Sequence, residues 1–219
     1  GIRDFDVASL REIELVHSLL PHARMHFMHP VKSREAIRYA YRVGIRTFSF
    51  DHIDELRKIQ EETAGAQDLA LFLRLKVDGG KALYDLGGKF GVDVQSAPLL
   101  LERARQIAAK LGVCFHVGSQ CMDPNAFAEA IRSVAELINT TGVKLDALDI
   151  GGGFPSRYPG MEPPKRHLYF DAIHEAIKAY DLTDMELISE PGRAMIADAG
   201  AVAVCVELRK GADLYLNDG

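Results

Sequence analysis

The chain has 219 residues, 47% of them hydrophobic, and a formal net charge of −5, and this length is sufficient for one large domain with a buried core. The mild acidity and the lack of a basic stripe argue against nucleic-acid binding and membrane-surface binding. No apolar run reaches the roughly 18 residues that span a bilayer. The three cysteines, Cys114, Cys121 and Cys205, form no paired framework and no Cys-x-x-Cys motif, which favours a reducing cytoplasm.

Short apolar runs alternate with amphipathic patterns along the whole chain. The first half predicts strands at 5–8, 25–28, 47–50 and 69–77, with helices from about residue 9, at 34–43 and at 54–62. The second half predicts strands at 113–117, 145–150 and 185–189, with helices at 98–111, 125–139 and 169–180. A β-branched and alanine-rich run over 194–208 predicts further strand. Ser9, with Glu12 three residues later, has the spacing of a capping box at a helix start.

Seven consecutive βα units predict a parallel sheet with right-handed crossovers. Seven is one fewer than the eight units of a closed (β/α)8 barrel. In such a barrel, and also in an open doubly wound sheet, the functional site lies at the carboxyl ends of the strands. No G-x-G-x-x-G motif follows the first strand, which disfavours the Rossmann alternative. The residues that follow the predicted strands and can carry chemistry are Asp6, His29, Arg74, His116, Ser119, Gly151, Gly152, Gly153, Glu190 and Arg193.

The three consecutive glycines, Gly151, Gly152 and Gly153, directly follow the predicted strand at 145–150. Glycine accepts positive φ and lets another group approach the backbone closely. The amides of such a loop form a concavity that suits an anion, and phosphate is the natural guest. Taken alone, the run fits a simple strand-to-helix turn equally well. The runs HVGS at 116–119 and EPGR at 190–193, each after its own apolar run, favour the functional interpretation.

These motifs resemble the signatures of one known family. The runs HVGS at 116–119, DIGGGFP at 149–155 and EPGR at 190–193 resemble those of the pyridoxal-phosphate-dependent decarboxylases with an alanine-racemase-like barrel, in particular the ornithine-type branch. The runs FDVAS at 5–9, KFG at 89–91 and YLNDG at 215–219 fit the same pattern. The resemblance implies a TIM-type (β/α)8 barrel that here lacks its first strand and spans residues 1–193. Residues 194–219 would lead into a C-terminal β-domain that is mostly absent.

The resemblance also implies roles around the cofactor, pyridoxal 5′-phosphate. Glu190 would lie beside the ring nitrogen and keep it protonated, and His116 would stack on the ring as the second catalytic group. Asp6 and Arg74 would lie near the ring edge, although structural polar contacts are the alternative for both. Such a cofactor draws electrons from the substrate Cα, while the protein supplies placement and electronics.

Two further sets of groups follow from the same resemblance. Arg193 and Ser119 would bind the cofactor phosphate together with the amides of the glycine loop, with a structural ion pair as the alternative for Arg193. Asp218 would receive the distal ammonium of a diamino acid substrate. Lys89 would form an ion pair across the interface of a homodimer, or else be an ordinary surface lysine.

No metal site is expected, because the histidines show no His-x-x-x-His with a third ligand.

The activity implied is decarboxylation of a basic amino acid, L-ornithine to putrescine in polyamine biosynthesis or L-lysine to cadaverine, with active sites at the dimer interface. The family's cofactor lysine would precede Asp6, and Lys32 and Lys76 lie in no matching motif. We therefore expect this chain to be part of a longer protein and inactive alone. The alternatives are a racemase, a non-catalytic decarboxylase-like regulatory binding protein, and a phosphate-binding barrel without the cofactor.

Overall fold

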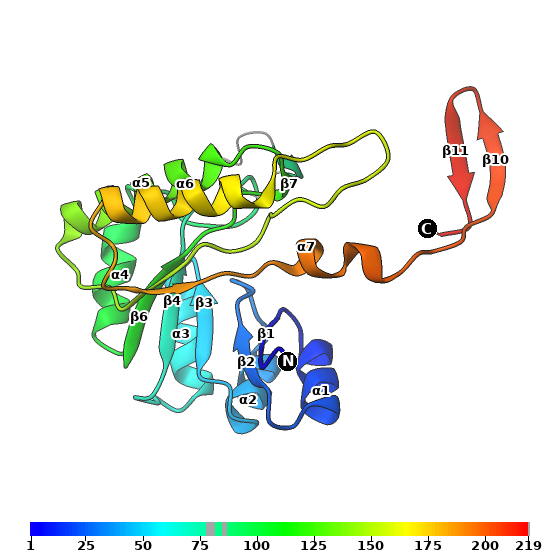
Figure 1. The fold of residues 1–219 in the computed structure, drawn as a ribbon. Helices are drawn as coiled ribbons and strands as arrows, with labels where there is room; N and C mark the ends of the chain where they lie inside the picture. The colour runs from blue at the N-terminus through cyan, green and yellow to red at the C-terminus, as the bar shows by residue number, and fades with distance from the viewer. Residues whose placement is uncertain (78–81, 85–86, 219) are drawn as a thin grey trace.

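A seven-stranded parallel sheet forms the body of the protein in the computed structural model, which describes residues 1–77, 82–84 and 87–218 (Figure 1). The strand order β1-β2-β3-β4-β6-β8-β9 follows the order of these strands along the chain. The strands are β1 (Asp4–Val7), β2 (Arg24–Phe27), β3 (Thr47–Phe50), β4 (Ala70–Arg74), β6 (Lys110–Cys114), β8 (Ala147–Asp149) and β9 (Glu186–Ile188). The sheet curls like part of a barrel wall, with β1 and β9 at its two edges.

Helices cover the outer face of this sheet (Figure 1). They are α1 (Leu10–Leu19), α2 (Arg34–Arg42), α3 (Ile53–Glu62), α4 (Ala97–Arg105), α5 (Asn125–Thr141) and α6 (Arg166–Ala179). The main core lies between helices and sheet, where Ile13, Ile37, Ile59, Leu101 and Ile131 are fully buried. Each such side chain contributes about 1.5–3 kcal/mol by leaving water. The outer helical layer therefore holds the curl of the sheet.

A second, smaller cluster fills the inner side of the curl. It consists of Met28, which follows β2, together with Phe72 of β4, Cys114 of β6 and Ala147 of β8. Gly112 of β6 faces the Phe72 ring so closely that a Cβ there would overlap the ring. The absence of a side chain at this glycine leaves room for the Phe72 ring.

Serine caps begin the first two helices, as the pattern around Ser9 predicts. The Ser9 hydroxyl accepts a hydrogen bond from the Glu12 amide at 3.3 Å, and the Glu12 carboxylate accepts one from the Ala8 amide. Ser33 caps α2 in the same way, through the Ala36 amide at 3.1 Å. Glu12 is therefore occupied in capping.

The seven strands predicted from the sequence are all present, but several predicted boundaries were wrong, most of all the end of α4. The helix predicted over 98–111 ends at Arg105, and the following strand begins at Lys110 rather than at 113. The guanidinium of Arg105 donates to the Ala108 carbonyl at 2.6 Å and to the Asp146 carboxylate at 2.8 Å. These hydrogen bonds satisfy the Ala108 carbonyl and the Asp146 carboxylate beyond the end of the helix. The helix can therefore end at Arg105, and the strand can begin at Lys110.

The prediction of continuous strand over 194–208 was also wrong. Helix α7 (Gly192–Ile196) and the 3-10 turn η1 (Ala197–Ala199) occupy its first part, and β10 begins only at Val206. Pro191 precedes α7, and its fixed φ suits a helix start. Strand β10 (Val206–Lys210) pairs with β11 (Asp213–Leu216) as an exposed hairpin that stands away from the body (Figure 1). The β-branched residues of this run do not by themselves decide whether it forms a strand, because strand formation also depends on a neighbouring strand of the main sheet, and this run has none among the described residues.

A short antiparallel pair, β5 (Ala82–Tyr84) and β7 (Ser119–Cys121), lies where the loops after β4 and β6 meet. Gly118, with φ of +90°, packs so closely on Tyr84 that a Cβ would lie 2.8 Å from its carbonyl oxygen. This pairing positions Ser119. No helix in the described part of the chain is long and apolar enough to cross a membrane.

Candidate active site

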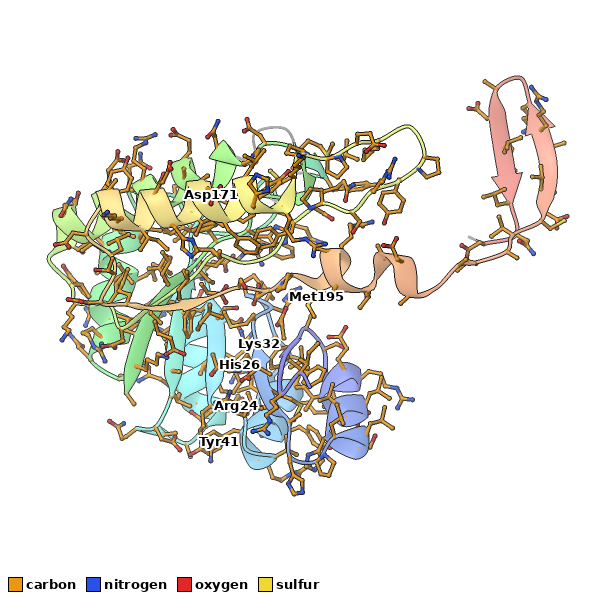
Figure 2. All side chains as sticks on the ribbon, viewed as in Figure 1. Arg24, His26, Lys32, Tyr41, Asp171 and Met195 are labelled. Carbon is orange, nitrogen blue, oxygen red and sulfur yellow. The ribbon has the colours of Figure 1, made fainter. Side chains whose placement is uncertain are left out.

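A cavity of about 540 Å³ opens between the two edge strands, β1 and β9. Its wall combines Met28 and Phe72 of the inner cluster with polar residues from both edges and with α7. Arg24 and His26 on β2 lie on one side of it, and Met195 of α7 lies above them in the view of Figure 2. Its lining residues include Asp4, Asp6, Met28, Phe72, Asp149 and Glu190.

The polar groups near the amino ends of the first strands are paired with one another. Arg24 donates to the Asp4 carboxylate at 2.7 Å, and the His26 ring contacts the other Asp4 oxygen at 3.1 Å. His26 also contacts the Thr47 hydroxyl at 3.1 Å. The two bases hold the pKa of Asp4 below its usual range, through their hydrogen bonds first. This end of the cavity is therefore a satisfied structural network.

At the carboxyl ends of the strands, three acids converge from β1, β8 and the loop after β9. Asp149 is 1% exposed, and Gly151 donates its amide hydrogen to Asp149 Oδ1 at 2.8 Å. The carboxyls of Asp149 and Glu190 lie in hydrogen-bonding contact, so one of them must hold a proton. Glu190 Oε1 is buried and receives no hydrogen bond from any described residue. A buried acceptor without a donor is costly, which marks this atom as a place for a ligand donor.

Burial controls the protonation of these acids. Desolvation raises the pKa of Asp149 to about 6, while the Gly151 amide opposes the rise. The pKa of Glu190 is raised well above its usual range, by burial first and then by the charges of Asp149 and Asp6. Asp6 is exposed at the open edge of the sheet, yet neighbouring atoms crowd its carboxyl, and this desolvation raises its pKa to about 6. Nearby Arg74 favours the charged forms of Asp149 and Glu190.

His116 stands beside this acidic group in its neutral form. Gly118 donates its amide hydrogen to His116 Nδ1 at 2.9 Å, which leaves any proton of the neutral ring on Nε2. Burial, and then the charge of Arg74, lowers the pKa of His116 to about 4. Arg74 lies in one cross-strand row with Cys114 and Asp149, and its guanidinium lies 5.2 Å from the centre of the Phe90 ring. The site thus offers a neutral imidazole face next to a carboxyl pair.

The glycine loop passes between the loops that follow β6 and β9, and this crowding explains why it has no side chains. A Cβ on Gly151 would overlap the Phe115 carbonyl, and one on Gly152 would lie 2.5 Å from the Glu190 carbonyl oxygen. Gly153, with φ of +98°, faces the Gly118 carbonyl in the same way. The loop is therefore packed directly against both His116 and Glu190 through its backbone.

The loop retains amides for a ligand, but fewer than the sequence predicts. The Gly151 amide is taken by Asp149, and the Gly151 carbonyl accepts from the Glu190 amide at 2.8 Å. The amides of Gly152 and Gly153 donate to no other described residue. Only these two of the three glycines therefore present a backbone donor to an anion.

Arg193 and Ser119 meet beside the loop, although they come from different strand ends. Arg193 Nε donates to Ser119 Oγ at 3.3 Å, and Arg193 Nη1 donates to the Tyr158 hydroxyl at 2.8 Å. The Arg193 carbonyl accepts from Ser156 Oγ at 3.0 Å. Within the described ranges Arg193 forms no ion pair with a carboxylate. Its guanidinium is therefore available for an anion near the glycine amides.

The lysines nearest the strand ends are engaged elsewhere. Lys32 is buried and ion-paired with Glu55 at 3.0 Å, and its Nζ donates to the carbonyls of His29 and Ser49. Lys76 lies 3.8 Å from Asp93 at the surface. No lysine lines the cavity in the part of the chain that the structure describes. The described residues also contain no group of three His, Cys, Asp or Glu side chains arranged for a metal ion.

Of the residues predicted for the site, Asp6 and Glu190 line the cavity, whereas His29, Lys89 and Asp218 are among those that do not. His29 and Lys89 both pack on the Phe90 ring, at centroid distances of 5.2 and 5.0 Å. Asp218 is exposed beyond β11, at the base of the C-terminal hairpin. Its role toward a substrate stays a prediction, because the described fold does not bring it to the acids of the cavity.

Sequence reasoning missed two residues of the site. Asp149 stands inside the glycine motif, and its position two residues before Gly151 was the available signal for a carboxylate that binds the loop's own amide. Tyr158 lies in the proline-rich loop at 156–164, and no local pattern marks its hydroxyl as a partner of Arg193.

Known proteins resemble this chain in sequence and in fold. A family model described as "Pyridoxal-dependent decarboxylase, pyridoxal binding domain" matches residues 1–197. Ornithine decarboxylase of Mus musculus is 37% identical over 217 residues, which cover 94% of this chain and 45% of that protein. Antizyme inhibitor 2 of Xenopus laevis is 36% identical over 223 residues, covering 98% of this chain and 47% of that protein.

Among solved structures, a lysine/ornithine decarboxylase from Vibrio vulnificus, complexed with putrescine, superposes with a TM-score of 0.77. It is 29% identical, and the match covers 97% of this chain and 57% of that one. The chain thus spans about half the length of the relatives that it matches.

Proposed function

The chain belongs to the pyridoxal-dependent decarboxylase family through its pyridoxal-binding domain, and on that premise we propose that it serves the decarboxylation of a basic amino acid. The substrates proposed are L-ornithine, giving putrescine for polyamine biosynthesis, and L-lysine, giving cadaverine. The cofactor of the domain is pyridoxal 5′-phosphate. When bound, this cofactor draws electrons from the substrate Cα into its ring and so stabilises the carbanion left by loss of CO₂.

The observation that carries the proposal is the buried Glu190 carboxyl. Its Oε1 lacks a donor among the described residues, and the pyridine ring of the cofactor offers one N–H. A glutamate at this place would hold the ring nitrogen in its protonated, electron-withdrawing form. His116 would present its neutral face to the ring, because its pKa of about 4 prevents it from carrying charge at neutral pH. Asp6 and Arg74 complete the polar surroundings of the ring.

The phosphate end is supported by the second group of residues. The amides of Gly152 and Gly153, the hydroxyl of Ser119 and the guanidinium of Arg193 converge beside the same loop. Four such donors form a phosphate cradle of ordinary composition, and their place after the last strands suits a barrel of this type. In this proposal Gly151 contributes its conformation, with φ of +64°, rather than its amide.

The proposal includes an arrangement beyond this chain. The lysine that attaches the cofactor would come from a first barrel strand between β1 and β9, and Asp218 would bind the distal ammonium of the substrate. Exposed apolar residues on α7 and on the hairpin, Met195, Ile196 and Leu214 among them, support further protein cover on this side. We place the active protein in the cytoplasm as a homodimer.

The test uses the full-length protein, purified with pyridoxal phosphate. The absorbance spectrum is recorded before and after borohydride reduction, and the reduced protein is mapped by mass spectrometry. We expect the cofactor on one lysine that is neither Lys32 nor Lys76. A substrate panel of ornithine, lysine, arginine and diaminopimelate, read by CO₂ release, then names the substrate. A protein that binds no cofactor under these conditions refutes the proposal.

A second function, a non-catalytic partner-binding protein, is favoured by one finding, the 36% identity to an antizyme inhibitor. Such a protein would not need a cofactor cradle, whereas Glu190, His116 and Arg193 are all assembled here. A full-length protein that binds no cofactor and releases no CO₂ from any substrate of the panel would favour this second function.

A further inference from the structure

Asp149 links the glycine loop to Glu190. Its Oδ1 accepts from the Gly151 amide at 2.8 Å, the Gly151 carbonyl accepts from the Glu190 amide at 2.8 Å, and its carboxyl meets that of Glu190. Asp149 is also 1% exposed. The residue is therefore bound on both sides and cannot turn to water.

Two carboxyl groups in contact inside a protein hold one proton between them, because two adjacent negative charges cannot both be ionised without solvent. The groups that face this pair are few. Asp6 on β1 adds negative charge, and Arg74 on β4 adds positive charge. Cys114 on β6 is buried, and burial raises the pKa of its thiol well above the usual range, so it is neutral. His116 after β6 is neutral because burial lowers its pKa to about 4. Of the three acids, Glu12 and His26 affect Asp6.

We propose that Asp149 is a positioning residue that takes up the proton of Glu190 when a cationic N–H donor binds at Glu190. In the free site Glu190 holds the proton and donates it to the Asp149 carboxylate. When the donor arrives, the Glu190 O–H bond breaks and an O–H bond forms on Asp149, so Glu190 becomes the carboxylate that the cation needs. The pair carries one proton and one negative charge in both states.

The contacts of Asp149 favour this exchange. The Gly151 amide stabilises one oxygen of Asp149 in either protonation state, as carboxylate or as the carbonyl oxygen of the acid. The other oxygen is left to carry or to receive the proton. Glu190 thereby ionises without a change in the net charge of a buried site, which avoids the cost of adding charge there.

The inference rests on the proposed function for the identity of the cation, which is the protonated ring nitrogen of the cofactor. The sharing of the proton between Asp149 and Glu190 concerns the free protein alone. The measurement is the infrared C=O absorption of protonated carboxyl groups in the full-length protein at pH 7.5, freed of cofactor. Samples labelled with ¹³C in glutamate or in aspartate assign the band. Asp6 is mostly ionised at this pH, because its pKa is about 6. We expect one glutamate band, and we expect it to become an aspartate band when pyridoxal phosphate is added.

The variant Asp149→Asn separates proton sharing from a purely structural role. The asparagine keeps the acceptor for the Gly151 amide, but its NH₂ donates to Glu190, which then ionises and loses the band. The matched control is Asp123→Asn, since Asp123 Oδ1 also accepts from the amide two residues later, Asn125, at 3.0 Å and outside the site. The control should keep the band.

A glutamate band that persists in Asp149→Asn overturns the inference, as does a band that stays on glutamate with cofactor bound. If the protein binds no cofactor, the proposed function fails, and the bands of the free protein and of Asp149→Asn still decide whether the two acids share a proton.

Discussion

Replacing Gly152 with alanine tests whether the glycine loop is selected for backbone packing against the site. The φ of Gly152 lies outside the left-handed range, so alanine meets no backbone strain there. A Cβ would lie 2.5 Å from the Glu190 carbonyl oxygen and 3.3 Å from His116 Nε2. The first distance is about 0.9 Å short of the 3.4 Å at which ordinary contact begins, so backbone must move. We expect a loss of about 1–3 kcal/mol in the free energy of unfolding, the usual range for overpacking.

The movement displaces Glu190 and His116 together, so Gly152→Ala should also weaken cofactor binding. Loss of one contact of about 1.4 kcal/mol corresponds to a tenfold weaker affinity. The assays are urea unfolding and absorbance titration of the cofactor-free full-length protein with pyridoxal phosphate. The matched control is Gly200→Ala, because Gly200 also has no left-handed φ, its Cβ would meet nothing within 4 Å, and it does not line the cavity. The reasoning is refuted if Gly152→Ala matches the wild type in both assays, or if Gly200→Ala loses as much.

Three further predictions concern charge. Glu190→Gln should lower kcat of the full-length enzyme by about ten- to a hundredfold, which corresponds to the loss of a charged hydrogen bond of about 1.5–3 kcal/mol. An unchanged kcat would contradict the role of the Glu190 carboxylate. Arg193→Lys removes the guanidinium that bonds both Ser119 and Tyr158, and it should weaken cofactor affinity about tenfold in titration. The control is Arg157→Lys, which should leave the affinity unchanged, because Arg157 is exposed and paired with Glu162. Because burial raises the pKa of Asp149 from 3.8 to about 6, the folded state binds its proton more tightly, and this stabilisation is present below about pH 4 and lost as pH rises through about 6. The unfolding free energy of Asp149→Asn relative to wild type should therefore rise by at least about 3 kcal/mol between pH 4 and 7 in urea melts, and a difference that does not change with pH would contradict this.

Local pattern was enough to predict the order of strands and helices. The strands of the main sheet are short apolar runs or short segments of alternating apolar and polar residues, and each pairs in parallel with its neighbour, so periodicity and the handedness of βα units already imply the curled sheet. The Ser9 cap is decided by residues within one turn of the helix, which is why the spacing to Glu12 predicted it. The prediction failed over 194–208, where strand or helix depends on a partner strand and not on composition.

For the site, the sequence placed the right residue types at strand ends, but it could not say which of their hydrogen-bonding groups are free to bind a ligand. The three glycines look equivalent in sequence, yet only the fold shows that the Gly151 amide is occupied by Asp149. Arg193 and Ser119 are far apart along the chain, and their contact depends on how the loops after β6 and β9 meet.

The amino-acid sequence by itself determined the βα order, the family motifs and the positions that can carry chemistry, because those depend on residues close together in the chain. Only the tertiary structure decided that Asp6, Asp149 and Glu190 share one cavity, and that Glu190 lacks a donor there. The protonation of these acids follows from desolvation and from like charges brought together by the curl of the sheet. No local sequence pattern encodes the environment of these acids, because that environment is assembled from strands at the two opposite edges of the sheet.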